Sequence, residues 1–208
     1  MAQITWKPGT MLYPVPAVLI TSSFQGRDNV CTVSWVGTVC TEPPMIGISL
    51  RPERYTYELI KKSKEFVINI PDKKLVKAVD FCGVRSGKKY DKFSIAHLTR
   101  LPAEKVKAPL IEECPISIEC KVIKILNLGS HNQFIGKVLL VHVDDALLDK
   151  RGALHLERAG LLCYNHGFYC AVDKQIGKFG FSVKKRKNKI HATVSSVEYK
   201  RLFFDLCC

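Results

Sequence analysis

The stretch 29–56, NVCTVSWVGTVCTEPPMIGISLRPERYT, predicts two short strands that lead into the start of a helix. The strands are expected over residues 30–36 and Met45–Leu50, where β-branched and apolar residues recur between turn-forming residues. Side chains alternate along a strand, so Thr32 and Ser34 are expected on one face of the first strand.

The second half of this stretch indicates a binding site. Gly47 has no side chain, so a flat group can approach the backbone there. Arg51 stands where the strand ends and the helix begins, a place that suits an anion. We therefore predict a site for an anionic, partly planar ligand. The alternative is two ordinary half-buried strands followed by a surface arginine.

The rest of the chain continues in short strands with few helices. We expect further strands at 17–23, Glu65–Ile70, 116–126, 133–143 and 162–172, helices at 53–62 and 73–84, and a long polar loop at 83–93. No repeated strand–helix–strand rhythm, internal repeat or linker is visible. This pattern predicts one mainly β domain, an antiparallel barrel with helical insertions.

Composition is that of a globular protein with an excess of positive charge. The chain has 208 residues, 47% of them hydrophobic, and a formal net charge of +13. Such a charge favours anionic partners, although the basic run 184–189 is typical of a solvated, mobile face. Because no apolar run approaches the roughly 20 residues of a membrane span and no signal peptide is visible, we expect a soluble cytoplasmic protein without a membrane partner.

The cysteines and histidines do not predict a metal site. Nine cysteines contain no CxxC pair, and no two of the six histidines have the i, i+4 spacing of helical zinc ligands. Reduced thiols are expected. Cys31 and Cys40 flank the strand that carries Thr32 and Ser34. Because those hydroxyls are expected to face the ligand, Cys31 is expected on the opposite face of the strand, in packing. We expect both cysteines to be structural.

Five motifs together resemble a known family. They are NVCTVSW (29–35), ISLRPERYT (48–56), RSGKKYDKF (85–93), ECPISIEC (113–120) and GSHNQFIGKV (129–138). In this order they resemble the flavin reductase-like, FMN-binding split-barrel family, especially its flavoredoxin-type members. The resemblance implies a mainly β (α+β) fold, an antiparallel Greek-key split β-barrel with helical insertions. It covers a domain at 1–182, matched from about residue 13, and leaves 183–208 as a basic C-terminal tail.

The resemblance also implies a homodimer that holds FMN non-covalently near the subunit interface. Carried over by motif, the cofactor-binding residues are Asn29, Thr32, Val33, Ser34 and Trp35, then Ser49, Leu50, Arg51, Tyr55 and Thr56, then Ser86, Lys88, Lys92 and His131. Arg51, Lys88 and Lys92 are expected to recognise the phosphate. His131 falls in a glycine-acid-histidine motif, where this chain has Ser130 at the acidic position.

The implied function is that of an FMN-binding flavoprotein oxidoreductase. It would be an NAD(P)H-dependent flavin reductase or a flavoredoxin-like electron-transfer protein with a redox partner protein. We name no catalytic side chain, because the flavin carries the redox chemistry. The alternative is a basic nucleic-acid-binding module without redox activity. The run 184–189 contains no aromatic residue, which disfavours nucleic acid as a partner.

Overall fold

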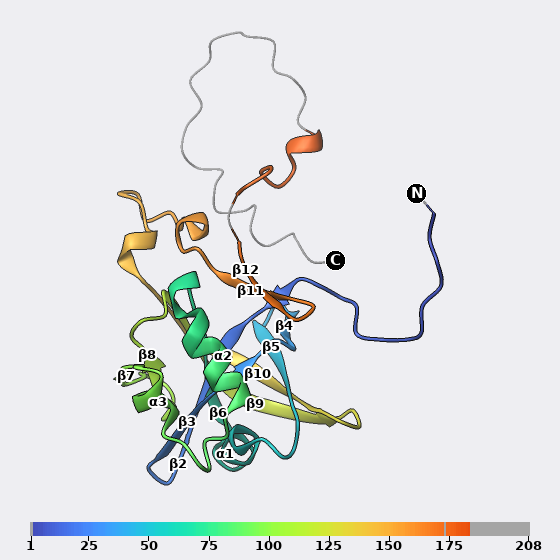
Figure 1. The fold of residues 1–208 in the computed structure, drawn as a ribbon. Coiled ribbons are helices and arrows are strands. Elements are labelled where there is room, and N and C mark those ends of the chain that lie inside the picture. The colour runs from blue at the N-terminus through green and yellow to red at the C-terminus, as the bar shows by residue number, and fades with distance from the viewer. Residues whose placement is uncertain (1, 173, 184–208) are drawn as a thin grey trace.

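A seven-stranded antiparallel sheet curls into the body of the protein (Figure 1). The computed structural model describes residues 2–172 and 174–183. The strands of this sheet are β2 (Val18–Phe24), β3 (Arg27–Val33), β4 (Val36–Cys40), β5 (Met45–Leu50), β6 (Glu65–Ile70), β9 (Ile116–Asn127) and β10 (Asn132–Val143). Their order is β3-β2-β6-β9-β10-β5-β4, and each neighbouring pair is antiparallel.

Helices and two small sheets surround this barrel. The helices are α1 (Tyr55–Ser63), α2 (Val76–Val84) and α3 (Lys92–Ile95), and single 3-10 turns lie at Lys73–Leu75, Asp145–Leu147, Leu156–Arg158 and Phe181–Val183. The small sheets are β1 (Val15–Pro16) with β11 (Leu162–Asn165) and β12 (Phe168–Ala171), and β7 (Arg100–Leu101) with β8 (Leu110–Ile111). The predicted mainly β, antiparallel barrel with helical insertions is therefore confirmed.

Two predicted strands were each too long. The run 30–36 breaks at Ser34 and Trp35, because the chain there crosses from β3 at one edge of the sheet to β4 at the other. The Trp35 carbonyl accepts a hydrogen bond of 2.9 Å from the Ser49 amide and so ties this crossing to β5. The run 162–172 is a hairpin, turned by His166 at φ 44° and Gly167 at φ 96°.

The helices begin near the predicted positions. The first begins at Tyr55 rather than residue 53, because Arg54 still has an extended backbone. Asp72 caps the second predicted helix, as its carboxylate accepts a 2.9 Å hydrogen bond from the Lys74 amide. That helix starts as a 3-10 turn and becomes α-helical at Val76.

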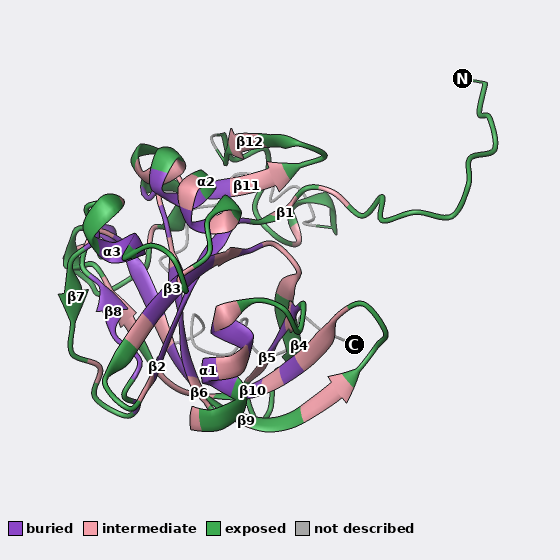
Figure 2. Ribbon diagram, turned by 60° about the horizontal axis from the view of Figure 1, so that its bottom comes forward, coloured by how far each residue is buried: buried purple, intermediate pink, exposed green. Residues whose placement is uncertain are grey.

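Two hydrophobic clusters lie on the two sides of β3, a strand that is buried over much of its length (Figure 2). The barrel interior contains Cys31 and Val33 of β3, with Tyr57 and Ile60 reaching in from α1. On the outer side α2 packs through Val79 and Cys82 against Val30 and Leu19. The strand is thus buried on both faces, between the barrel interior and α2.

Within the described ranges, no helix has both the length and the apolar character needed to cross a membrane. The basic run 184–189, on which the nucleic-acid alternative rested, lies outside those ranges, as do Cys207 and Cys208.

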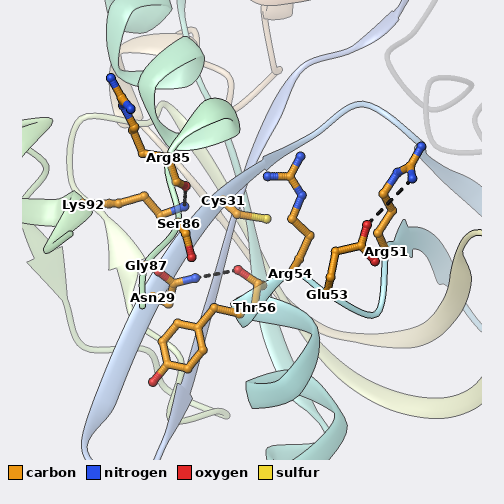
Figure 3. Close-up of a pocket in the computed structure, with 11 residues that line it drawn as sticks. Asn29, Cys31, Arg51, Glu53, Arg54, Thr56, Arg85, Ser86, Gly87 and Lys92 are labelled. Atoms are coloured by element: carbon orange, nitrogen blue, oxygen red, sulfur yellow. Dashed lines mark hydrogen bonds and ion pairs between the residues drawn. The ribbon is translucent and has the colours of Figure 1, made fainter. Parts of the chain in front are cut away.

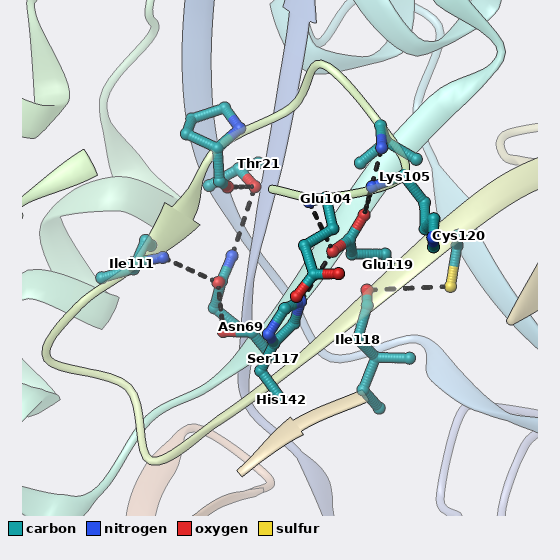
Figure 4. A network of polar contacts seen from close by, with 12 residues as sticks. Thr21, Asn69, Glu104, Lys105, Ile111, Ser117, Ile118, Glu119, Cys120 and His142 are labelled. Atoms are coloured by element: carbon teal, nitrogen blue, oxygen red, sulfur yellow. Dashed lines mark hydrogen bonds and ion pairs between the residues drawn. The ribbon is translucent and has the colours of Figure 1, made fainter. Parts of the chain in front are cut away.

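One buried carboxylate fixes the segment between β7 and β8 (Figure 4). The Glu119 side chain is fully buried and accepts backbone hydrogen bonds from Glu104 at 3.0 Å, Lys105 at 2.6 Å and Val106 at 3.1 Å. The Nε2 atom of His142 lies 2.6 Å from Oε1, the carboxylate oxygen that also accepts from the Glu104 amide. Burial alone would raise the pKa of Glu119, yet these hydrogen bonds hold that pKa below its usual value.

We predict that Glu119→Ala destabilises the protein strongly. One buried donor left without an acceptor costs about 1–3 kcal/mol, and this change removes the acceptor of several donors. Urea unfolding should show the loss, while Glu112→Ala at an exposed position should leave the free energy of unfolding nearly unchanged.

The Glu119 contribution should also depend on pH. A carboxyl group whose pKa is lowered on folding stabilises the protein above its unfolded pKa of about 4.3 and loses that effect as the pH falls further. Wild type and Glu119→Ala should therefore converge in stability at acidic pH. A constant difference between them from neutral to acidic pH would contradict this role.

Candidate functional site

A hollow of about 480 Å³ opens where β3, the start of α1 and the loop after α2 meet (Figure 3). Its walls come from four parts of the chain. They comprise Asn29 and Cys31 of β3, Arg51, Glu53, Arg54, Tyr55 and Thr56 around the start of α1, Arg85, Ser86 and Gly87 after α2, and Lys92 of α3. Four basic side chains and one acidic side chain line this hollow, which therefore favours an anion.

The inner face of β3 supplies the wall of the hollow. Asn29 and Cys31 point the same way along the strand, and both line it. Thr32 points the opposite way, and its hydroxyl donates a hydrogen bond to the Val79 carbonyl of α2. Cys31 belongs to the barrel core, as expected, and also lines the hollow. The orientation of Thr32, away from the hollow, differs from the expectation. Its physical reason is α2, which packs on the outer face of β3.

The amino end of α1 opens into the hollow without a side-chain cap. Arg54 occupies the N-cap position and makes no capping hydrogen bond, while Tyr55 and Thr56 begin the helix at the wall. Free N–H groups and the helix dipole make such an end attractive to anions. The guanidinium of Arg54 donates to the Gly83 carbonyl at 3.1 Å, and Arg51 lies 3.8 Å from Glu53. Both arginines thus stand beside an open helix terminus.

A short polar contact forms the floor. The Asn29 amide donates a 2.6 Å hydrogen bond to the Thr56 hydroxyl, and these residues are 4% and 1% exposed. Gly87 passes directly over Asn29, since a Cβ atom on Gly87 would lie 1.9 Å from the Asn29 Oδ1 atom. This packing couples β3, α1 and the loop after α2 at one point.

Lys92 supports the hollow from behind. It is 3% exposed, and its ammonium donates to the carbonyls of Cys82 at 2.9 Å and Arg85 at 3.1 Å. Burial lowers the pKa of Lys92. The contacts tie the carboxyl end of α2 to α3 and hold the intervening loop in place.

Lys88, the other lysine predicted at the site, forms an ion pair with Glu58. It lines a second hollow of about 420 Å³ that shares Asn29, Tyr55, Gly87 and Lys92 with the first. Both predicted phosphate-binding lysines therefore already have protein partners.

Other predicted site residues lie outside the hollow. Val33 and Leu50 belong to the barrel core. Trp35 lies in the crossing with Ser34, its ring 6.2 Å from that of Tyr13, and Ser49 bonds to its carbonyl.

His131 lies in the β9–β10 loop, where its Nδ1 atom is 3.0 Å from the Ser130 hydroxyl. Burial first and the charge of Arg51 second lower the pKa of His131, but this ring does not line the hollow.

Six predicted residues do meet at the hollow: Asn29, Arg51, Tyr55, Thr56, Ser86 and Lys92. The sequence reasoning missed five further lining residues, which are Cys31, Glu53, Arg54, Arg85 and Gly87. Four of these lie inside the quoted motifs 48–56 and 85–93, and period-two alternation counted from Asn29 would have found Cys31.

We predict that Gly87→Ala breaks the floor of the hollow. The new methyl group displaces the Asn29 amide from Thr56, and a hydrogen bond of this kind contributes about 0.5–1.5 kcal/mol to the free energy of unfolding. Gly37→Ala is the matched control, because no heavy atom lies within 4 Å of a Cβ there. In an Asn29→Ala background the cost of Gly87→Ala should shrink. An unchanged cost in that background would show that Asn29 is not what the methyl group meets.

Comparison with known proteins identifies the family. Residues 10–173 match the family model described as flavin reductase like domain. Flavoredoxin of Desulfovibrio vulgaris (Miyazaki F) is 32% identical with a TM-score of 0.82, over 88% of this chain and 100% of that one. Flavoredoxin from Methanosarcina acetivorans is 27% identical with a TM-score of 0.79 over the same shares. An uncharacterized protein of Archaeoglobus fulgidus is 38% identical over 138 residues, which cover 66% of this chain and 77% of that protein. The chain therefore belongs to the flavin reductase-like family, and its function is flavin-related oxidoreduction.

Proposed function

We propose that this chain binds one FMN non-covalently, with the phosphate at the amino end of α1. The observation that carries this proposal is the uncapped terminus of α1 flanked by Arg51 and Arg54 in one hollow. A phosphate dianion accepts hydrogen bonds from free backbone N–H groups and from guanidinium groups. The Ser86 hydroxyl faces the same hollow and adds a donor. Lys92 acts indirectly, by holding the loop that carries Ser86.

The remaining wall fits the neutral parts of such a cofactor. Asn29 and Thr56 offer a polar floor for hydroxyl groups, and Tyr55 and Cys31 offer less polar surface. A bound flavin supplies the hydride and electron transfer, and the side chains of this protein bind and orient it.

The electron-transfer role that we favour is flavoredoxin-like exchange with a redox partner protein. The likeness to two flavoredoxins supports it, as does Ser130 at the position where an acidic residue is expected beside His131. Direct reduction by NADH or NADPH is the second candidate, supported by the family itself. Anaerobic mixing of the FMN-loaded protein with either nucleotide separates them. Rapid bleaching of the flavin identifies a reductase, and lack of bleaching favours the protein partner.

Phosphate recognition gives a sharp test of the cofactor. Denaturing the purified or FMN-loaded protein should release FMN, at about one per chain. We predict that Arg51→Ala weakens FMN binding about tenfold, the effect of one charge-assisted hydrogen bond at an open site. Riboflavin lacks the phosphate and should lose much less. Arg151→Ala, an exposed arginine far along the chain, serves as the matched control. Equal losses for FMN and riboflavin would contradict phosphate recognition by Arg51.

We also propose that the protein is a homodimer in which the N-terminal arm packs on a second copy. The arm, residues 2–12, leaves the barrel in an extended conformation (Figure 1). Its apolar side chains are displayed to solvent, with Trp6 80% and Leu12 87% exposed. Large apolar residues gathered on one exposed segment are typical of an interaction surface.

Sedimentation of the full chain should show a dimer. The double variant Trp6→Ser/Leu12→Ser should shift the equilibrium toward monomer, because it removes two of the large exposed apolar side chains of the arm. Lys7→Ser changes an exposed polar residue of the same arm and should leave the dimer intact. A wild-type protein that sediments as a monomer while it holds FMN would refute the homodimer and leave the cofactor proposal standing.

A further inference from the structure

Two cysteines face each other across the β11–β12 hairpin. Cys163 and Cys170 are direct partners in the ladder, and both are half-buried free thiols. Cys40 is also half-buried, but its nearest ladder partner is Met45. Cys31, Cys82, Cys114 and Cys120 are buried, and among the described strands no other cysteine stands opposite another.

The position of this pair in the ladder sets the distance between the two backbones. The Val172 amide donates to the Leu161 carbonyl at 2.8 Å, so Leu161 and Val172 form a hydrogen-bonded pair. Hydrogen-bonded and non-hydrogen-bonded pairs alternate along an antiparallel ladder, which makes Cys163 and Cys170 hydrogen-bonded as well. The Cα atoms of such a pair lie about 5.5 Å apart. That separation falls within the ~4.4–6.8 Å range that a disulfide spans.

The two thiols also lie close enough for one to affect the ionisation of the other. Burial raises the pKa of Cys163, and the neighbouring thiol of Cys170, through its charge and a side-chain hydrogen bond, raises it further. Directly opposite residues share a face of the sheet, and the face of the two cysteines is not the one that packs on α2. Leu162, Tyr164 and Tyr169 occupy that packed face. The thiol pair therefore stands apart from the hydrophobic core and is reachable by a small reagent.

We propose that Cys163 and Cys170 form a dithiol site that reduces a small disulfide and closes into a cross-strand disulfide bond. The thiolate of one cysteine attacks a sulfur of the small disulfide, forms a mixed disulfide and releases the first small thiol. The second cysteine then attacks the protein sulfur of that mixed disulfide and releases the second small thiol. The protein loses two electrons and two protons, and the small disulfide gains them.

The geometry supports closure without a large rearrangement. The hairpin is joined by a two-residue turn, and on one side it is held by β1, which pairs Pro16 with Cys163. On its packed face the Tyr169 hydroxyl donates to the Asp80 carboxylate of α2 at 3.3 Å. These contacts keep the two strands in register, so a thiol that has reacted stays opposite its partner.

The experiment uses the full chain in a Cys207→Ser/Cys208→Ser background, because those adjacent thiols could react with the same reagents. The protein is exposed to hydroxyethyl disulfide, the remaining thiols are alkylated and the chain is digested with trypsin. Both cysteines fall in the tryptic peptide 159–174. We expect this peptide to lose two hydrogen atoms and to escape alkylation. Cys163→Ser and Cys170→Ser should each retain a mixed disulfide on the other cysteine, and Cys40→Ser should behave as the parent.

The proposal is overturned if both cysteines of the peptide are alkylated after this treatment, or if each carries its own mixed disulfide. Should either serine variant fail to fold, phenylarsine oxide decides on the parent protein, since one trivalent arsenic bridges two adjacent thiols with loss of water. Arsenic that bridges both cysteines of peptide 159–174 supports the dithiol site. Absence of that bridge overturns it.

Discussion

The burial of β3 on both faces decides where the site of this protein lies. Cys31 and Val33 fill the barrel interior, and Val30 packs under α2. Because side chains alternate along a strand, a shift of one residue would exchange the two sets and disrupt both cores. Asn29 continues the inner face beyond the point where the barrel is filled, so its amide emerges beside the first turn of α1.

Charge at the site is divided between structural and available groups. Lys92 is buried, and its ammonium donates hydrogen bonds to the carbonyl oxygens at the end of α2, where the helix dipole is negative. Lys88 is paired with Glu58. The guanidinium groups of Arg51 and Arg54 remain at the mouth of the hollow, where Arg51 lies beside Glu53 and Arg54 donates to the Gly83 carbonyl. The two arginines can therefore bind an anion while the two lysines keep the contacts that hold the walls of the hollow.

Helix α2 links the site to the small sheet. Its carboxyl end leads into the loop that covers Asn29, and its outer side meets Tyr169 of the hairpin. The hairpin thus has one face committed to packing and another that carries Cys163 and Cys170. Separation of the two faces lets the same short element serve as a structural support and present a reactive pair.

Local alternation and several ordered motifs were sufficient to predict the strands Met45–Leu50 and Glu65–Ile70, the long β9–β10 hairpin and the family. The sequence also placed Arg51 at the start of a helix. The face of β3 that meets the hollow, in contrast, depends on packing between segments that are distant in the sequence. A strand buried on both faces reads as a run of apolar and small residues, so its sequence does not distinguish inside from outside. The packing of α2 on the outer face of β3 fixes which face points inward. As a result Cys31, and not Thr32, lines the hollow.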